Sequence, residues 1–224
     1  MRVGILGSGL MGGKLGTLFA RAGHEVVFSY ARSREKLNRL AREAGGDARA
    51  GIPSEAARDA DALLLAVHWS RVDDVLRQTG DVSGKVLLTC SLPLNEDDTE
   101  LVVAHTSSGA EELARKVPGA AVVSALVSAP SEVLFGVFDA RDKSPRPSMV
   151  YCGDDAGAKR VAARLISDLG FEPVDSGPLR VARYIEPFTM LVGKLAYEGD
   201  GGPELAYRFE RFGRRSATSN TEPG

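Results

Sequence analysis

A glycine-rich turn near the N-terminus constrains the fold more than any other feature of the chain. It follows the apolar run at residues 3–6 and reads Gly7-Ser8-Gly9-Leu10-Met11-Gly12. A helical pattern over about 10–22 and a second apolar run at 25–28 come next. In such a unit the first glycine permits the tight turn, the second admits a pyrophosphate and the third lets the helix pack on the strand. The turn predicts dinucleotide binding; a glycine turn without a ligand is the alternative interpretation.

Short apolar runs alternate with helical patterns through the first 125 residues. Further strands are expected at 48–50, 62–67, 86–90 and 121–125, with helices at 33–44, 53–58, 70–78 and 109–117. Continuous apolar strands separated by helices are typical of a parallel sheet covered on both faces. We therefore predict an α/β fold, a Rossmann-type doubly wound, mostly parallel sheet, with residues 1–125 as its nucleotide-binding domain.

The chain after residue 125 has a different rhythm. Residues 149–152, 155–169 and 171–174 read as another strand–helix–strand unit. Helical patterns cover 130–138, 179–197 and 205–212, and Pro187 should kink or restart the second of these. We expect a small mixed α/β, helix-ending C-terminal part over 126–213 and a disordered tail over 214–224.

Charge and cysteine content exclude several classes of function. Lys plus Arg number 28 and Asp plus Glu number 30, so the net charge of −2 argues against nucleic-acid or membrane partners. No apolar run approaches a membrane span, and glycine interrupts the N-terminal run too early for a signal peptide, which favours a cytoplasmic protein. Two cysteines and three scattered histidines predict neither a disulfide framework nor a metal site.

The end of the second strand indicates which dinucleotide is bound. NAD sites usually place an acidic residue here for the ribose hydroxyls, yet residues 28–32 contain none. Ser29, Arg32, Ser33 and Lys36 stand there instead. Hydroxyl and cationic donors suit a 2′-phosphate, so the sequence predicts NADP(H) as cofactor. We interpret Arg34, by contrast, as a solvated helix charge.

Several motifs together resemble the NADPH-dependent reductases of coenzyme F420 and their bacterial relatives. They lie at residues 2–7, 22–27, 33–36, 67–69, 105–112, 152–155, 171–179 and 183–187. The resemblance covers roughly residues 1–212. It implies hydride transfer between NADP(H) and coenzyme F420 or a related flavin-like acceptor, with the acceptor in a cleft between the two parts of the chain. It also implies a homodimer.

The resemblance assigns cofactor contacts residue by residue. Ser8, Gly9, Leu10 and Met11 would bind the pyrophosphate. The 2′-phosphate would be bound by Ser29, Arg32 and Lys36. The resemblance places Val67, His68 and Trp69 along the adenosine-side ribose and the pyrophosphate. It places Ser91, Leu92 and Pro93 at the next strand end, toward the nicotinamide. Trp69 is equally open to a packing role in the core.

The expected acceptor pocket departs from the family pattern. It comprises Leu126, Val127, Ser128, Ala129 and Pro130, and Val127 stands where the family carries a polar residue beside the rings. An amide there could orient a ligand by hydrogen bonds, whereas valine cannot. His68 likewise replaces a common proline. These changes leave the prediction of NADP(H) binding intact. They weaken the prediction that the acceptor is coenzyme F420.

Hydride transfer between two rings asks little of side chains beyond alignment and exclusion of water, so we expect no acid/base triad. A carbonyl or imine acceptor would need a proton donor, for which His68 is the one weak catalytic candidate. Two hypotheses therefore stay open: an NADPH-dependent reductase of a carbonyl, imine, quinone or ferric chelate, and a non-catalytic NADP(H)-binding redox sensor.

Other polar residues receive structural interpretations. We expect His24 to be structural and Asp154 and Asp155 to begin the following helix. Arg183 either pairs with Glu186 one turn away or reaches the acceptor, and we favour the pair.

Overall fold

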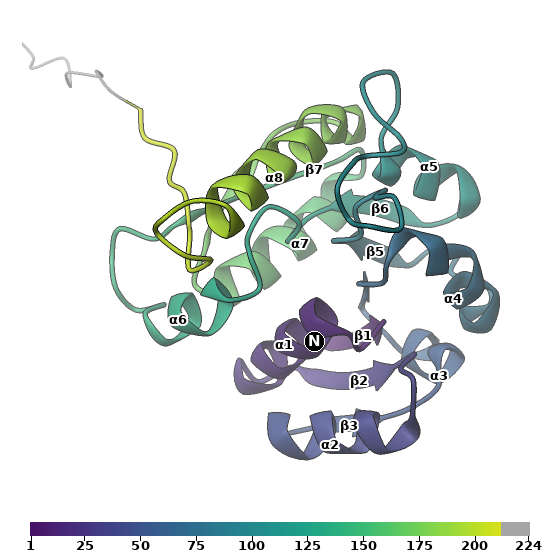
Figure 1. Cartoon of the computed structure of the whole chain (residues 1–224). Helices are drawn as coiled ribbons and strands as arrows, with labels where there is room; N and C mark the ends of the chain where they lie inside the picture. Colours follow the sequence, from purple (N-terminus) through teal and green to yellow (C-terminus); the bar gives the residue numbers. More distant parts are fainter. Residues whose placement is uncertain (212–224) are drawn as a thin grey trace, which may run out of the picture.

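Eight strands form one sheet in the computed structural model of the chain, which describes residues 1–211 (Figure 1). Their order is β3-β2-β1-β4-β5-β6-β7-β8. The first six are parallel and comprise β1 (Arg2–Leu6), β2 (Glu25–Ser29), β3 (Ala48–Ala50), β4 (Ala62–Leu65), β5 (Val86–Thr89) and β6 (Ala121–Ser124). This is the predicted doubly wound α/β fold.

Helices cover both faces of the parallel strands, because these strands, apart from the edge strand β3, bury apolar side chains on both sides. One face packs on α1 (Leu10–Arg21), α2 (Arg34–Ala44), α6 (Val133–Asp139) and α7 (Ala156–Asp168). The other face packs on α3 (Pro53–Arg58), α4 (Val72–Thr79), α5 (Gly109–Lys116) and α8 (Ala182–Tyr197). Short 3₁₀ turns, η1 (Trp69–Arg71) and η2 (Leu179–Val181), precede α4 and α8.

The sheet continues past residue 125 without a break. β7 (Ser148–Gly153) pairs with β6 in the antiparallel direction, and β8 (Glu172–Asp175) pairs with β7 in parallel. The predicted second strand–helix–strand unit, β7–α7–β8, therefore extends the same sheet.

Strand order fixes where a ligand can bind. β1 pairs with β2 on one side and with β4 on the other, so the chain reverses its winding direction at β1. Ligands of open α/β sheets bind outside the carboxyl ends of the strands at such a switch point. The glycine turn after β1 lies at this place.

The C-terminal segment differs from its prediction. Residues 205–211 form no helix, and the predicted last residue, Phe212, lies outside the described residues together with the expected tail at 214–224. The carbonyl of Tyr207 accepts a hydrogen bond from the backbone N–H of Ser148, and Phe209 donates its N–H to the Ser148 hydroxyl. The segment therefore runs beside β7, where strand-like backbone bonds replace helical ones. α8, for its part, continues through Pro187 without restarting.

Within residues 1–211, none of the helices combines the length and the apolar character that a membrane span requires.

Candidate functional site

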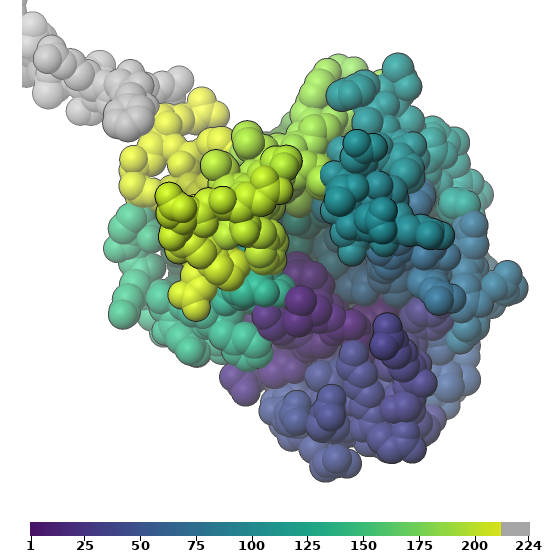
Figure 2. Space-filling model, in the orientation of Figure 1, coloured from purple at the N-terminus to yellow at the C-terminus, as the bar shows by residue number. Residues whose placement is uncertain are grey.

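Two cavities meet at the glycine turn. The first, of about 850 Å³, lies between the turn, the end of β2 and the end of β4. The second, of about 510 Å³, lies between the start of α1, the ends of β5 and β6, and α8. In the space-filling view the N-terminal segment is recessed between α8 and the teal loop that follows β5 (Figure 2). We call the first the cationic cavity and the second the apolar cavity.

The three glycines of the turn have different surroundings. Gly7 adopts φ +114°, which favours glycine, and a Cβ on Gly12 would lie 1.8 Å from the Gly7 carbonyl oxygen. A Cβ on Gly9, by contrast, would meet nothing within 4 Å. Gly9 is also the N-cap of α1 and contributes no side-chain cap, so the first N–H groups of α1 have no side-chain acceptor. The open space and free donors fit a pyrophosphate.

Positive charge surrounds the cationic cavity. Four cationic side chains line it, namely Arg32, Arg34, Lys36 and Arg71. The lining carboxylate, Asp74, accepts bonds from the Tyr30 hydroxyl at 2.6 Å and from Arg77 at 2.7 Å, which lower its pKa. Burial and the bond to Asp74 raise the pKa of Tyr30 to about 12. Arg32 and Lys36 thus lie where the sequence placed them.

Arg34 and Arg71 extend this set. Arg34 is exposed at the rim of the cavity, so its interpretation as a solvated helix charge stays a prediction. Arg71 escaped sequence reasoning because it follows β4, about 40 residues after the expected phosphate site. Its place in the first turn of the helix expected at 70–78, shortly after the predicted strand at 62–67, was the available signal.

The predicted serines have structural partners. Ser29 is fully buried and donates its hydroxyl to the Ile5 carbonyl at 2.7 Å, so it does not line the cavity. Ser8 lines the cavity, but its hydroxyl donates to the Ser29 carbonyl and its N–H to the Tyr30 carbonyl. Ser33 lines the cavity too and accepts the Lys36 N–H as the N-cap of α2. The prediction that Ser29 binds the 2′-phosphate is therefore wrong, because its hydroxyl joins β2 to β1 inside the sheet.

The end of β4 contributes Val67 and His68 to the cationic cavity. His68 Nδ1 accepts the Ser70 N–H, so Nε2 carries the proton and donates to the Asn95 carbonyl at 3.2 Å. Asp98 lies 3.2 Å from the same nitrogen. His68 thus joins β4 to the loop after β5 and lines the cationic cavity rather than the apolar one, and its role as a proton donor stays a prediction.

Trp69 and Ser91 lie behind the site. Trp69 packs against the core beneath α4 and lines neither cavity. Ser91 accepts the Val67 N–H at 3.2 Å and donates to the Leu65 carbonyl at 3.4 Å, which joins the ends of β4 and β5. Trp69 thus has the packing role that the sequence left open, and the Ser91 hydroxyl bonds two backbone groups; the cofactor contacts of both residues stay predictions.

The apolar cavity contains most of the expected nicotinamide and acceptor residues. Among those predicted, it is lined by Leu10, Met11, Leu92, Val127, Ser128, Ala129 and Pro130. Two others lie behind it: Leu126 is buried at φ +62°, and Pro93 packs under Gly109. Cys90 also lines the cavity, and burial raises the pKa of its thiol to about 12, so it is an apolar wall residue.

Sequence reasoning missed the contribution of α8 to the apolar cavity. The α8 side of this cavity is lined by Thr189, Met190, Val192, Gly193, Lys194, Tyr197 and Glu198. The C-terminal segment supports the floor, because the Tyr207 hydroxyl lies 2.6 Å from the Ser128 hydroxyl. No sequence motif marked these residues, and their helical pattern alone did not show which face meets the site.

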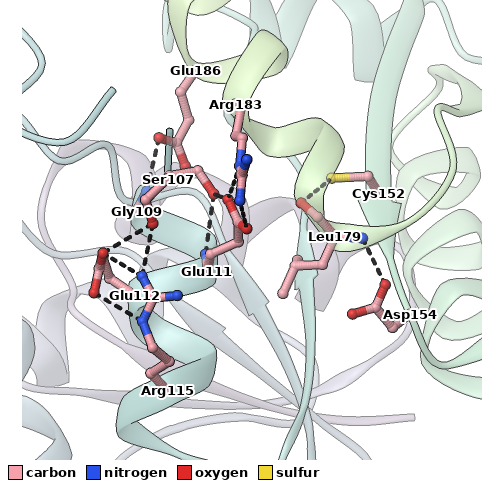
Figure 3. A network of polar contacts seen from close by, with 11 residues as sticks. Ser107, Gly109, Glu111, Glu112, Arg115, Cys152, Asp154, Leu179, Arg183 and Glu186 are labelled. Atoms are coloured by element: carbon pink, nitrogen blue, oxygen red, sulfur yellow. Dashed lines mark hydrogen bonds and ion pairs between the residues drawn. The ribbon is translucent and has the colours of Figure 1, made fainter. Parts of the chain in front are cut away.

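Two carboxylates dock α8 on the N-terminus of α5 (Figure 3). Glu186 is 3% exposed and accepts the backbone N–H groups of Gly109 and Ala110 at 2.9 and 3.0 Å. Burial raises its pKa to about 7 although these bonds oppose the shift. Arg183 forms a two-bond ion pair with Glu111 at 2.8 and 2.7 Å. The expected Arg183–Glu186 ion pair is therefore wrong, because Glu186 accepts the first N–H groups of α5 and Arg183 pairs with Glu111 instead.

The remaining polar predictions concern structural residues. His24 is buried and bonds Asp168 of α7 at 3.0 Å, and Asp155 caps α7 by accepting the Ala158 N–H. Asp154 instead accepts the Leu179 N–H at the start of η2. Within residues 1–211, no group of three or more His, Cys, Asp or Glu residues is arranged to hold a metal ion.

Comparisons with known proteins agree with the resemblance. Residues 2–93 match the sequence model of the family described as NADP oxidoreductase coenzyme F420-dependent. The F420-dependent NADP reductase of Methanocaldococcus jannaschii is 26% identical over 155 residues, 66% of this chain and 68% of that protein. Metalloreductase STEAP3 of Rattus norvegicus is 26% identical over 189 residues, 84% of this chain. The match spans 36% of the metalloreductase.

Solved structures share the fold. A protein of Arthrobacter sp. FB24, provisionally named an F420-dependent NADP reductase, superposes with a TM-score of 0.82 at 23% identity, covering 94% of this chain and 100% of that one. A reductive aminase of Aspergillus terreus bound to NADPH gives 0.63 at 20% identity, covering 86% of this chain and 60% of that one. The predicted resemblance to NADP-dependent oxidoreductases of the F420 family is confirmed.

Proposed function

We propose that the chain is an NADPH-dependent oxidoreductase that transfers hydride between NADP(H) and a flat ring acceptor, coenzyme F420 or a related flavin-like compound. One observation supports it most: a cationic cavity and an apolar cavity adjoin at a glycine turn that is open to a pyrophosphate. The two cavities supply a phosphate-binding end and a water-poor ring-binding end for one extended cofactor.

The cationic cavity suits the 2′-phosphate of NADP(H). Arg32 and Lys36 follow β2, and Arg71 approaches from the end of β4. Guanidinium groups bind phosphate through two parallel hydrogen bonds. An NAD site would instead offer a free carboxylate to the ribose, but Asp74 already accepts bonds from Tyr30, Arg77 and Gln78.

The apolar cavity suits ring-to-ring hydride transfer. NADPH supplies the hydride, the acceptor takes it up with a proton from water, and NADP⁺ remains. Leu92, Val127 and Pro130 form walls that exclude water and hold flat rings by contact. No side chain has to move a proton in this reaction, which agrees with the structural role of His68.

A different acceptor is the second candidate, and Val127 favours it. Valine replaces the polar residue that the F420 reductase resemblance places beside the rings, and it lines the apolar cavity. A small carbonyl or imine would then need a proton donor from the α8 side, where Tyr197 and Lys194 line the wall.

The test is NADPH oxidation by the purified chain with coenzyme F420, riboflavin and a panel of small carbonyl and imine compounds. We expect turnover with a flavin-like acceptor and much slower turnover with NADH. Turnover with carbonyls or imines alone would favour the second candidate. Tight NADPH binding without turnover on any acceptor would contradict both and indicate a redox sensor.

A further inference from the structure

Tyr30 has a backbone conformation that a bulky side chain rarely adopts. It follows β2 directly and has φ +56°, in the left-handed region that favours glycine. Residues in such conformations persist only where the surrounding structure holds them, and they cluster at functional sites. Tyr30 also lines the cationic cavity, so its unusual backbone belongs to the cofactor side of the site.

Two hydrogen bonds hold Tyr30 in place. Its carbonyl accepts the N–H of Ser8 in the glycine turn at 3.0 Å. Its hydroxyl donates to Asp74 of α4 at 2.6 Å. Asp74 also accepts bonds from Arg77 and Gln78 at 2.7 and 3.0 Å, which hold this carboxylate in position. Tyr30 therefore joins the glycine turn to α4, and its backbone and its ring each have an anchor.

Arg32 lies between two fixed points of the chain. Tyr30 is two residues before it, and Ser33, directly after it, accepts the Lys36 N–H at 3.2 Å as the N-cap of α2. The Arg32 side chain is exposed and lines the cavity, so the backbone on either side sets the direction in which it extends. Without the anchor of the Tyr30 ring, the left-handed turn can relax and Arg32 can move away from a bound phosphate.

We propose that Tyr30 is a positioning residue for cofactor specificity: its bond to Asp74 holds the turn after β2 so that Arg32 meets the 2′-phosphate of NADP(H). The proposal rests on the proposed function and adds a residue to its cofactor site. The hydroxyl does not itself donate to the phosphate, because its one proton is donated to Asp74. Burial and this bond raise the pKa of Tyr30 to about 12, so the anchor persists at neutral pH.

Tyr30→Phe tests the anchor, because it keeps the ring and removes the hydroxyl. Kd for NADPH and for NADH is measured by titration calorimetry on the wild type and the variant. We expect Kd for NADPH to rise about three- to tenfold, while Kd for NADH, which lacks the 2′-phosphate, stays within about twofold. Tyr151→Phe is the matched control, since Tyr151 lies on β7 and lines neither cavity, and it should change neither value.

A double variant shows whether Tyr30 acts through Arg32. In the Arg32→Ala background, Tyr30→Phe should cause no further loss of NADPH affinity, because the group that it positions is absent. Additive losses overturn the positioning role. An equal rise in Kd for both cofactors also overturns it, because a purely structural residue would affect them alike.

The outcomes separate this inference from the proposed function. If the wild type prefers NADPH and Tyr30→Phe keeps the full preference, the inference is overturned and the proposed function stands. Equal binding of both cofactors by the wild type contradicts the proposed cofactor and overturns the inference with it. The expected change in preference without hydride transfer to any acceptor supports the inference and contradicts the proposed function.

Discussion

Gly9 and Gly12 belong to one turn but face opposite surroundings, so alanine at each should have a different effect. A Cβ on Gly9 would point into open space, and Gly9 has φ −75°, which alanine tolerates. Gly9→Ala should therefore keep the melting temperature while its methyl group blocks the pyrophosphate. We expect NADPH affinity to fall by about tenfold or more, measured by calorimetry.

Gly12→Ala supplies the contrast. Its Cβ would lie 1.8 Å from the Gly7 carbonyl oxygen, so α1 must shift off the turn. We expect a loss of about 1–3 kcal/mol in unfolding free energy, as for other overpacked positions. Equal melting temperatures with equal NADPH affinities for the two variants would contradict this division of roles.

Arg32 should decide between the two nicotinamide cofactors. Its guanidinium lines the cationic cavity beside the end of β2, where a 2′-phosphate is expected. Arg32→Ala should raise KM for NADPH about 10- to 100-fold, since a charged hydrogen bond contributes roughly 1.5–3 kcal/mol. KM for NADH should stay unchanged.

Arg42→Ala is the matched control, because this exposed arginine of α2 lies outside the cavity. It should leave both KM values as they are. An equal rise for NADPH and NADH in the Arg32 variant would mean that Arg32 contacts a group common to both cofactors.

Residue types near the turn could be predicted from the sequence, but their directions could not. Ser29 ends β2 and Arg32 follows it, yet Arg32 lines the cavity and Ser29 bonds Ile5 inside the sheet. Side chains alternate faces along a strand, and the exact strand end sets the alternation. β2 runs through Ser29, one residue beyond its predicted end at 28, which places this hydroxyl within the sheet.

At the level of elements, the docking of α8 on α5 should make stability depend on pH. Burial raises the pKa of the Glu186 carboxyl from 4.5 to about 7. The folded chain therefore binds more protons than the unfolded chain between these values, and the unfolding free energy falls as pH rises through them. Each unit of pKa shift corresponds to roughly 1.4 kcal/mol.

Glu186→Gln removes this titration. The wild type should lose about 1–3 kcal/mol relative to the variant between pH 5 and pH 8, measured by urea unfolding at each pH. Glu172→Gln, an exposed change, should follow the wild type across the range. Parallel curves for the Glu186 variant and the wild type would show that Glu186 titrates normally.

The C-terminal segment shows where element prediction stops. Residues 205–211 have helical apolar spacing, but Tyr207 and Phe209 find partners that are distant in sequence. Tyr207 and Phe188 stack edge to face at 5.0 Å, and the Tyr207 hydroxyl bonds Ser128. Such contacts override a weak local preference for helix, and no pattern within seven residues reveals them.

For the whole molecule, the sequence predicts the fold well because its rules act between neighbours in the chain. Apolar runs, the glycine turn and the capping residues Ser33, Ser108 and Asp155 set most elements within a few residues. The apolar cavity depends instead on how α8 returns to cover the ends of β5 and β6. That return rests on Glu186 and Arg183 meeting α5, about 75 residues earlier in the chain.

The outer side of α8 supports a final prediction, a homodimer. Tyr184, Leu191 and Leu195 are 69%, 54% and 57% exposed and recur at spacings of seven and four, so they form one stripe. Exposed apolar stripes of this kind mark interaction surfaces. We expect twice the monomer mass by light scattering, and Leu191→Glu with Leu195→Glu should halve it.

A charge placed elsewhere separates this stripe from exposed apolar residues in general. Ile52 is 49% exposed but lines the cationic cavity, where the cofactor would cover it. Ile52→Glu should therefore keep the dimer mass while it weakens NADPH binding. A monomeric wild-type chain at tens of micromolar would contradict the dimer, and the apolar cavity beside α8 would then be complete within a single chain.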